Sequence, residues 1–310
     1  MSEQTILVVL QKEIKPHLRD LISTWQRHNY HPLYLFYDTE DGFPSTQKIA
    51  QHAERAFAVL AFTPSNRAPH TLLDGPYIEL KNNRIIPIGM VPYAGTESIA
   101  LFIQTTCAVH DRKKSKPNVC MLSQRLPRYI TVANKIHTQL EQKKHLRSLN
   151  WTGDIMYKED VLYGLNRGSA LTLYVGHGRA SGWVGFRGVK VQEMKLFAHK
   201  PTAVIFSLCC ETASRRKVAY SFSEQLILEG ISAVSIGATR KTLFTNNTRW
   251  AVSLGNELLE HVGTIGELLV NAKPSNPAAY KDYRLFGDPT IPIIPDKNFF
   301  TDIKHIESYA

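Results

Sequence analysis

The sequence predicts an α/β protein whose mostly parallel sheet is covered by helices. The main observation is that short apolar runs of strand length alternate with segments of helical spacing along all 310 residues. This alternation is typical of parallel sheets whose crossovers are helices. A second observation is the composition, with 43% hydrophobic and 21% charged residues, which is that of an ordinary globular protein. The length suits two modest domains or one large α/β unit.

The first third of the chain begins this alternation with four predicted strands. They are the apolar runs at residues 5–10, 31–37, 57–64 and 84–93. Helices are predicted at residues 17–28 and 45–55, where apolar residues recur at intervals of three and four and Ser45 provides a cap for the second. No glycine-rich phosphate-binding motif follows the first strand, so no nucleotide site is predicted.

A polar, basic stretch at residues 111–118 contains a proline and marks the predicted domain boundary. We therefore expect an N-terminal α/β subdomain at residues 1–110, a basic linker at 111–118 and a second α/β domain at 119–310. Strands of the second domain are predicted at 119–124, 171–175, 203–208 and 231–239. Its helices are predicted at 131–142, 218–230 and 249–261, and the segments 264–273 and 283–293 close it.

Cysteine usage predicts reduced thiols rather than a disulfide framework or a metal. The four cysteines are too few and too unevenly spaced for a framework, and they are Cys107, Cys120, Cys209 and Cys210. No CxxC or HExxH motif is present, so neither a metal nor a cofactor is expected.

The formal charge of +10 is concentrated between Asp111 and Asn150, where the net charge is +8. A solvated linker followed by a basic helix face accounts for it, and a surface for an acidic partner is the alternative. Aromatic residues of the kind that stack on bases are not interleaved with these cations, so nucleic acid is not an expected partner.

No membrane contact is expected, because no run of about 18 apolar residues is present. The first 17 residues lack the basic start and the small-residue cleavage site of a signal peptide. We therefore expect a cytoplasmic protein.

Two predicted strands end in residues suited to nucleophilic catalysis. LTLYV is followed by Gly176, His177 and Gly178, and AVIFSL is followed by Cys209 and Cys210. The carboxyl ends of parallel strands share one sheet edge, so we expect the two ends to meet. A histidine beside a thiol can accept its proton and later protonate the leaving amine.

The two glycines give a reason for leaving a histidine at a strand end. They would keep the imidazole accessible and let a substrate backbone approach. The amides of Gly178 and of the nucleophilic cysteine would stabilise an oxyanion. Taken singly, His177 reads as a surface residue and each cysteine as a small buried hydrophobe. Their occurrence together at strand ends favours a site.

Three stretches resemble gingipain-type cysteine peptidases of the caspase-like clan. They are LNRGSALTLYVGHGRASGW, AVIFSLCCET and YRLFGDPTIPI, in the expected order between about residues 119 and 295. The last two also resemble CHAT domains. The resemblance implies a caspase-like three-layer fold, with His177 as general base and acid and Cys210 as nucleophile. Cys209 stands where that family has a small residue and is expected to pack, and Gly287 with Asp288 is expected to form a structural turn.

The resemblance also implies a place for residues 1–110. They would correspond to the first, pseudo-caspase subdomain of a gingipain-like catalytic unit. The alternative is a TIR-type signalling domain, which the stretch AFAVLAFTPSN resembles.

Peptidases of this clan select one residue before the scissile bond, commonly a charged one. An acidic pocket would draw on carboxylates near the motifs, namely Glu211, Asp160 or Asp154. Trp183 is a further candidate substrate contact. A basic pocket would draw on Arg179, Arg215 or Arg216. The sequence leaves the choice between the two pockets open.

The predicted function is therefore an intracellular cysteine endopeptidase that performs limited proteolysis of a protein or peptide substrate. By analogy with the clan, it would act in bacterial defence or programmed cell death, with an activating partner or acidic ligand as a further contact. The alternative is a catalytically inactive caspase-like module that recruits an acidic partner through the basic segment.

Overall fold

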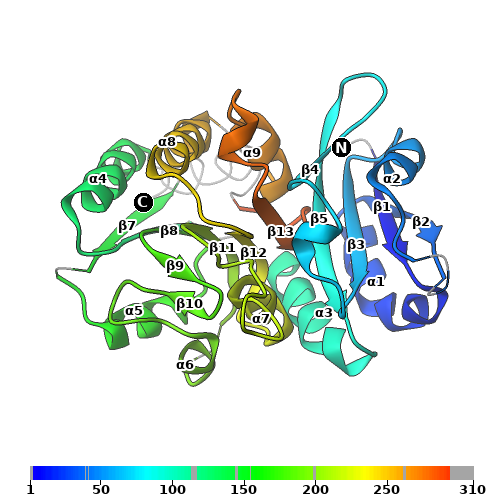
Figure 1. Ribbon diagram of the computed structural model, residues 1–310, viewed down its shortest axis with the longest axis horizontal. Helices are drawn as coiled ribbons and strands as arrows, with labels where there is room; N and C mark the ends of the chain where they lie inside the picture. The colour runs from blue at the N-terminus through cyan, green and yellow to red at the C-terminus, as the bar shows by residue number, and fades with distance from the viewer. Residues whose placement is uncertain are drawn as a thin grey trace, which may run out of the picture.

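The structure is a computed structural model, and it describes residues 3–293 except 39, 41, 113–116, 144–145, 154, 198–199 and 261–262. In this part of the chain, eleven strands form one sheet whose main order is β2-β1-β3-β5-β13-β12-β11-β8-β6-β7. The short strand β4 pairs with β5, and β9 and β10 form a separate two-stranded ribbon. Figure 1 shows the sheet running across the whole molecule.

The strands have the following bounds: β1 Gln4–Leu10, β2 Tyr30–Phe36, β3 Ala58–Pro64, β4 Tyr77–Glu79, β5 Ile85–Tyr93, β6 Asn118–Ser123, β7 Arg147–Thr152, β8 Leu171–Val175, β9 Gly178–Arg179, β10 Gly182–Trp183, β11 Thr202–Leu208, β12 Ser232–Ala238 and β13 Tyr283–Gly287. The α-helices are α1 Arg19–Arg27, α2 Thr46–His52, α3 Glu97–His110, α4 Pro127–Glu141, α5 Lys158–Leu165, α6 Val191–Lys195, α7 Phe222–Leu228, α8 Phe244–Glu260 and α9 Ile265–Asn271. Short 3₁₀ turns lie at Lys12–Leu18, Pro69–Thr71 and Pro277–Ala279.

The main sheet consists of two parallel halves that run in opposite directions. Strands β2, β1, β3, β5 and β13 are mutually parallel, and so are β12, β11, β8, β6 and β7. The halves meet where β13 pairs antiparallel with β12. The sheet is therefore continuous between residues 1–110 and the later part of the chain, because β13 also pairs with β5.

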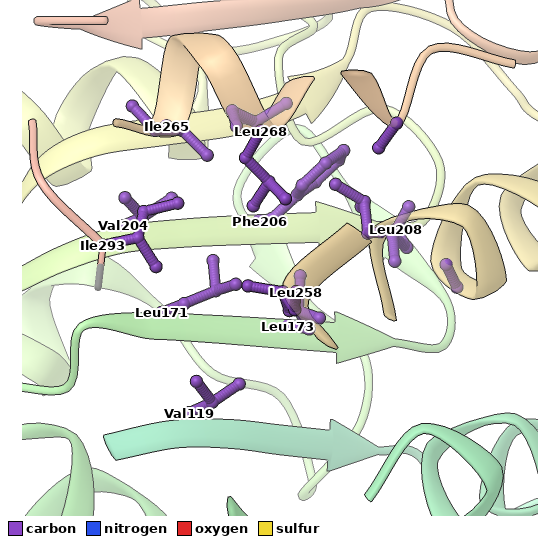
Figure 2. Packing of buried hydrophobic residues seen from close by; sticks show 14 of the residues in the cluster. Val119, Leu171, Leu173, Val204, Phe206, Leu208, Leu258, Ile265, Leu268 and Ile293 are labelled. Atoms are coloured by element: carbon purple, nitrogen blue, oxygen red, sulfur yellow. The ribbon is translucent and has the colours of Figure 1, made fainter. Parts of the chain in front are cut away.

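Helices cover both faces of the sheet and complete a three-layer fold. Figure 1 shows α4, α8 and α9 along one face, and α3, α5 and α7 along the other. Buried side chains of α8 and α9, such as Leu258 and Leu268, pack on Leu171 and Phe206 of the strands (Figure 2). This layered, mostly parallel architecture confirms the fold class that the alternating pattern predicts.

A buried carboxylate near the junction joins elements that surround the first half of the sheet. Asp288 follows β13, is fully buried, and accepts a hydrogen bond of 2.7 Å from the Trp25 indole of α1. It also accepts one of 3.0 Å from His110 Nε2 at the end of α3. The amide and hydroxyl of Thr290 donate to its other oxygen at 2.9 and 2.7 Å. Asp288 therefore joins elements that are far apart in the sequence.

Several elements are missing from the predicted pattern, and β7 and α3 show why. Strand β7 is an edge strand whose side chains are mostly half-exposed and polar, so it lacks the apolar run that identifies the central strands. Helix α3 is predominantly apolar around its circumference and packs against both α1 and α7, which obscures a one-sided helical pattern. No helix within the described ranges combines the length and apolarity needed to cross a bilayer.

Candidate active site

Strands β8 and β11 are parallel neighbours, and this brings the two motifs of interest to one sheet edge. Val175, the last residue of β8, pairs with Leu208, the last residue of β11. His177 and Cys210 each follow these partners by two residues. The expectation that the two strand ends meet is therefore confirmed.

The backbone of His177 is held on both sides by neighbouring elements. Its amide donates a 2.8 Å hydrogen bond to Oε1 of Gln124, which follows β6. Its carbonyl accepts hydrogen bonds from the Tyr174 hydroxyl at 3.0 Å and from the Val184 amide at 2.9 Å. The side chain nevertheless remains exposed. The loop is thus fixed while the imidazole stays accessible.

Gly178 is required by the close approach of the two strand ends. A Cβ atom at this position would lie closer than 3.0 Å to both the Cys210 carbonyl oxygen and the Cys209 sulfur. Because real side chains do not tolerate such contacts, only glycine allows the histidine loop to rest against the cysteine loop.

The imidazole of His177 contacts two residues from the first turn of α4. Nε2 lies 3.4 Å from Nη2 of Arg128 and 3.3 Å from the hydroxyl of Tyr129. A guanidinium has only donors, so Nε2 can take part in the contact with Arg128 only as an acceptor. Burial raises the pKa of Tyr129, and the thiols of Cys210 and Cys209 add to this rise while Arg128 opposes it. Tyr129 thus lies within electrostatic range of both the imidazole and the thiols.

The two adjacent cysteines differ in accessibility. Cys209 is completely buried, and burial raises the pKa of its thiol well above the usual value. Cys210 is partly exposed. A thiol that stays protonated and shielded cannot attack a substrate, so the structure favours Cys210 over Cys209 as a nucleophile.

The sulfur of Cys210 lies in a polar environment supplied by the loop after β12. The amide of Thr242 donates to Sγ at 3.4 Å, and Oγ1 of Thr242 lies 3.7 Å from it. Asn247 of α8 donates to that Oγ1 at 2.9 Å and accepts from the Tyr283 hydroxyl of β13 at 2.8 Å. Because Oγ1 already accepts a hydrogen bond from Asn247, its own proton is free to point at the sulfur. The thiol in turn lies 3.7 Å from the Thr242 carbonyl oxygen, to which it can donate.

The residues predicted to contact substrate are not all brought to this site. Glu211 is close to it, with a left-handed φ of 60°, and its carboxylate is 3.5 Å from Arg216. Asp160 accepts from the Tyr157 amide and caps α5. Trp183 is only 2% exposed, stacks on Tyr174 and donates to Ser207, so it packs in the core. Asp154 lies outside the described residues.

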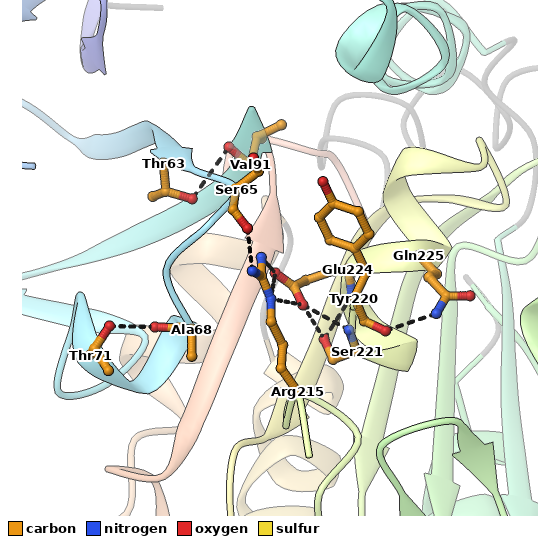
Figure 3. Close-up of polar contacts among 10 residues, drawn as sticks. All are labelled: Thr63, Ser65, Ala68, Thr71, Val91, Arg215, Tyr220, Ser221, Glu224 and Gln225. Carbon is orange, nitrogen blue, oxygen red and sulfur yellow. Dashed lines mark hydrogen bonds and ion pairs between the residues drawn. The ribbon is translucent and has the colours of Figure 1, made fainter. Parts of the chain in front are cut away.

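Arg215, one of the predicted cations for a basic pocket, is occupied within the protein. Its guanidinium pairs with the fully buried carboxylate of Glu224 at 2.5 Å and donates to the Ser65 carbonyl (Figure 3). Glu224 also accepts hydrogen bonds from the amide and hydroxyl of Ser221. The pair therefore anchors the loop between β11 and α7, and Arg215 is not available to a substrate.

Three residues around the two strand ends have no individual signal in the sequence: Arg128, Tyr129 and Thr242. A partial signal existed for Gln124, because VCMLSQ also reads as a strand that ends at the same edge. Arg112 of the basic segment donates to the carbonyls of Gly168 and Pro201, so it serves the fold. No group of three metal-ligating side chains is found among the residues described.

A mostly parallel, three-layer α/β fold with a histidine and an accessible cysteine at adjacent strand ends defines a caspase-like cysteine peptidase. The family model of Peptidase family C25 matches residues 10–294, and the chain therefore belongs to this family. It is a cysteine endopeptidase of the gingipain type. This result favours the enzyme over the inactive module considered above. A search of curated proteins finds no match.

Solved structures show the same fold at low sequence identity. The Arg-specific cysteine proteinase gingipain R superposes with a TM-score of 0.75 at 16% identity, covering 94% of this chain and 78% of that one. The complex of pro- and mature domains of the Porphyromonas gingivalis enzyme gives a TM-score of 0.72 at 16% identity, with coverages of 93% and 79%. Separase from Saccharomyces cerevisiae, in complex with securin, gives 0.54 at 14% identity and covers 78% of this chain and 16% of separase.

Proposed function

We propose that this peptidase cleaves proteins with a His177/Cys210 dyad. The observation that supports the proposal is the pairing of Val175 with Leu208, because the exposed His177 and the partly exposed Cys210 each follow one of these residues by two positions. In this proposal Nε2 of His177 is the proton acceptor. The amide of Thr242 donates to the Cys210 sulfur at 3.4 Å, and its hydroxyl oxygen lies 3.7 Å from it.

The proposed reaction proceeds through an acyl-enzyme. The Cys210 sulfur attacks the scissile carbonyl carbon, and its proton passes to Nε2 of His177. The resulting oxyanion accepts hydrogen bonds from the amides of Gly178 and Cys210. His177 then protonates the departing amine, the C–N bond breaks, and a thioester remains. Water attacks the thioester with His177 again as base, which releases the acid product and restores the thiol.

The biological setting extends this proposal. We expect limited proteolysis in the cytoplasm, where the four free cysteines would stay reduced. The yeast neighbour is a separase–securin complex, and this precedent supports control by a protein partner. A role in bacterial defence or programmed cell death rests on kinship of fold alone.

The test compares single-residue variants on a peptide library and with a thiol-reactive peptide inhibitor. Cys210→Ala and His177→Ala should each lower kcat/KM by at least about 1,000-fold. Cys210→Ala should also abolish labelling, whereas the matched variant Cys209→Ala should leave labelling and cleavage largely intact. Cleavage that survives in Cys210→Ala, or labelling that is lost only in Cys209→Ala, would refute the assignment.

A further inference from the structure

We infer that this peptidase prefers substrates with an acidic side chain next to the scissile bond, and that Arg128 recognises that side chain. The inference rests on the proposed His177/Cys210 function and adds to it the chemical class of the substrate. It starts from the charged groups that surround the imidazole.

Arg128 is an exposed cation held in place beside the dyad. Its guanidinium carbon lies 4.7 Å from the Tyr129 ring centroid and 5.3 Å from that of Phe244, so two aromatic rings support it. Nη2 donates to the Tyr129 hydroxyl at 3.0 Å. No carboxylate in the described ranges lies within 4.0 Å of this guanidinium. It is thus pre-oriented and available to an anion.

The position of Arg128 fixes the part of the substrate that it reaches. During attack the scissile carbonyl lies between the Cys210 sulfur and the His177 ring. Arg128 is 3.4 Å from Nε2 of that ring. A carboxylate on a residue that flanks the scissile bond is therefore within one side-chain length of the guanidinium, and Asp or Glu can form a charge-assisted, bidentate contact.

The carboxylates that would favour a basic substrate are already engaged. Glu211 pairs with Arg216, Asp160 caps α5, and Glu224 is buried against Arg215. They therefore do not offset the positive charge of Arg128 at the site.

A pocket beside the histidine loop also has a positively charged lining. It is lined by residues 179, 181–184 and 187–190, which include the cations Arg179, Arg187 and Lys190 and no acidic residue. It adjoins the site, because the amide of its lining residue Val184 donates to the His177 carbonyl. A second acidic residue of a substrate would find complementary charge there.

The test measures kcat/KM for four peptides that differ only at the residue before or after the scissile bond, with Asp, Glu, Leu or Arg there. The wild-type enzyme should cleave the acidic peptides at least about tenfold better than the Leu peptide, and the preference should shrink as salt is added. Arg128→Ala should bring the acidic-to-Leu ratio to within about threefold of one, and Arg128→Glu should reverse it towards the Arg peptide.

Arg167→Ala is the matched control. Arg167 also stacks on a tyrosine, Tyr163, at 5.0 Å and donates to its hydroxyl, but it lies on α5's side of the fold. Removing the Arg167 side chain should leave the acidic-to-Leu ratio of kcat/KM unchanged. Equal cleavage of Leu and acidic peptides by the wild type, or an unchanged ratio in Arg128→Ala, would overturn the inference while the dyad stands. Inhibition by an oligonucleotide as strong as by an acidic peptide would also overturn it, since this indicates general anion binding. Failure to cleave any peptide would refute the proposed function as well.

Discussion

Replacing Asp288 by alanine should strongly lower the free energy of unfolding, because this carboxylate joins three distant parts of the chain. The change removes the acceptor of four hydrogen bonds and leaves the buried donors of Trp25 and His110 without a partner. Breaking a buried, charge-assisted network of this kind costs about 3–5 kcal/mol. A typical protein has only about 5–15 kcal/mol of stability in total.

The assay is urea unfolding followed by far-UV circular dichroism, which does not depend on the indole of Trp25. The urea concentration at the unfolding midpoint should fall by the loss of unfolding free energy divided by the m-value. Asp288→Asn keeps the shape of the side chain and one acceptor, so the loss of unfolding free energy in this variant should be smaller. Asp20→Ala is the control, because this exposed acid in the first turn of α1 contributes at most about 1 kcal/mol. A loss for Asp288→Ala no larger than that of Asp20→Ala would refute the reasoning.

The same network predicts that the stability of the folded protein depends on pH. Burial acts to raise the pKa of Asp288, but the hydrogen bonds and charge of His110 and the bonds from Thr290 outweigh it and hold the pKa below its usual value. A carboxyl with a lower pKa in the folded state stabilises the fold above its unfolded value of about 3.9 and loses this contribution as the pH falls through the folded value. The stability difference between wild type and Asp288→Asn should therefore shrink below about pH 4.

Three further substitutions probe the site and its support. Thr242→Val removes the hydroxyl beside the Cys210 sulfur but keeps the amide, so iodoacetamide should alkylate Cys210 about threefold more slowly at neutral pH, measured by mass spectrometry. Gly178→Ala forces the histidine loop away from Cys210 and should lower kcat/KM about 100-fold in a peptide assay. Arg215→Ala leaves the Glu224 carboxylate buried without its cation and should cost about 3–5 kcal/mol in urea unfolding, with partial recovery in the double variant with Glu224→Gln.

Controls for these substitutions come from positions of similar chemistry. Thr239→Val removes a hydroxyl that donates to the Asp282 carbonyl rather than to sulfur, so the alkylation rate should not change. Gly75→Ala introduces a methyl group where the nearest atoms are 4.0 Å away, and activity should persist. Alkylation slowed equally by both threonine variants, or activity lost in both glycine variants, would contradict the specific roles assigned here.

Local pattern was sufficient to place the strand ends at the centre of the site. Strands β8 and β11 are buried on both faces, so their sequences are continuous apolar runs that end abruptly in Gly-His-Gly and Cys-Cys. By contrast, β7 is an edge strand with polar, half-exposed side chains, and its sequence lacks such a run. Burial on both faces is therefore the reason that the sequence predicts β8 and β11 but not β7.

Residues that act through tertiary contacts could not be assigned from the sequence. Arg128 precedes His177 by 49 positions and reaches it only because α4 begins beside the end of β8. Asp288 was expected in a structural turn, but its partner Trp25 is 263 positions away. The pattern indicated that this aspartate has a role in the turn, and only the packing of α1 and α3 around the end of β13 shows which side chains depend on it.

The place of β13 has a consequence for synthesis of the protein on the ribosome. Strands β5 and β12 leave the ribosome long before Tyr283–Gly287, the segment that pairs with both. Until then each presents an open backbone edge to other nascent chains. The hydroxyl of Tyr283 also completes the chain of contacts behind the Cys210 sulfur. A growing polypeptide therefore acquires the full set of contacts around the Cys210 thiol only when translation of this strand is finished.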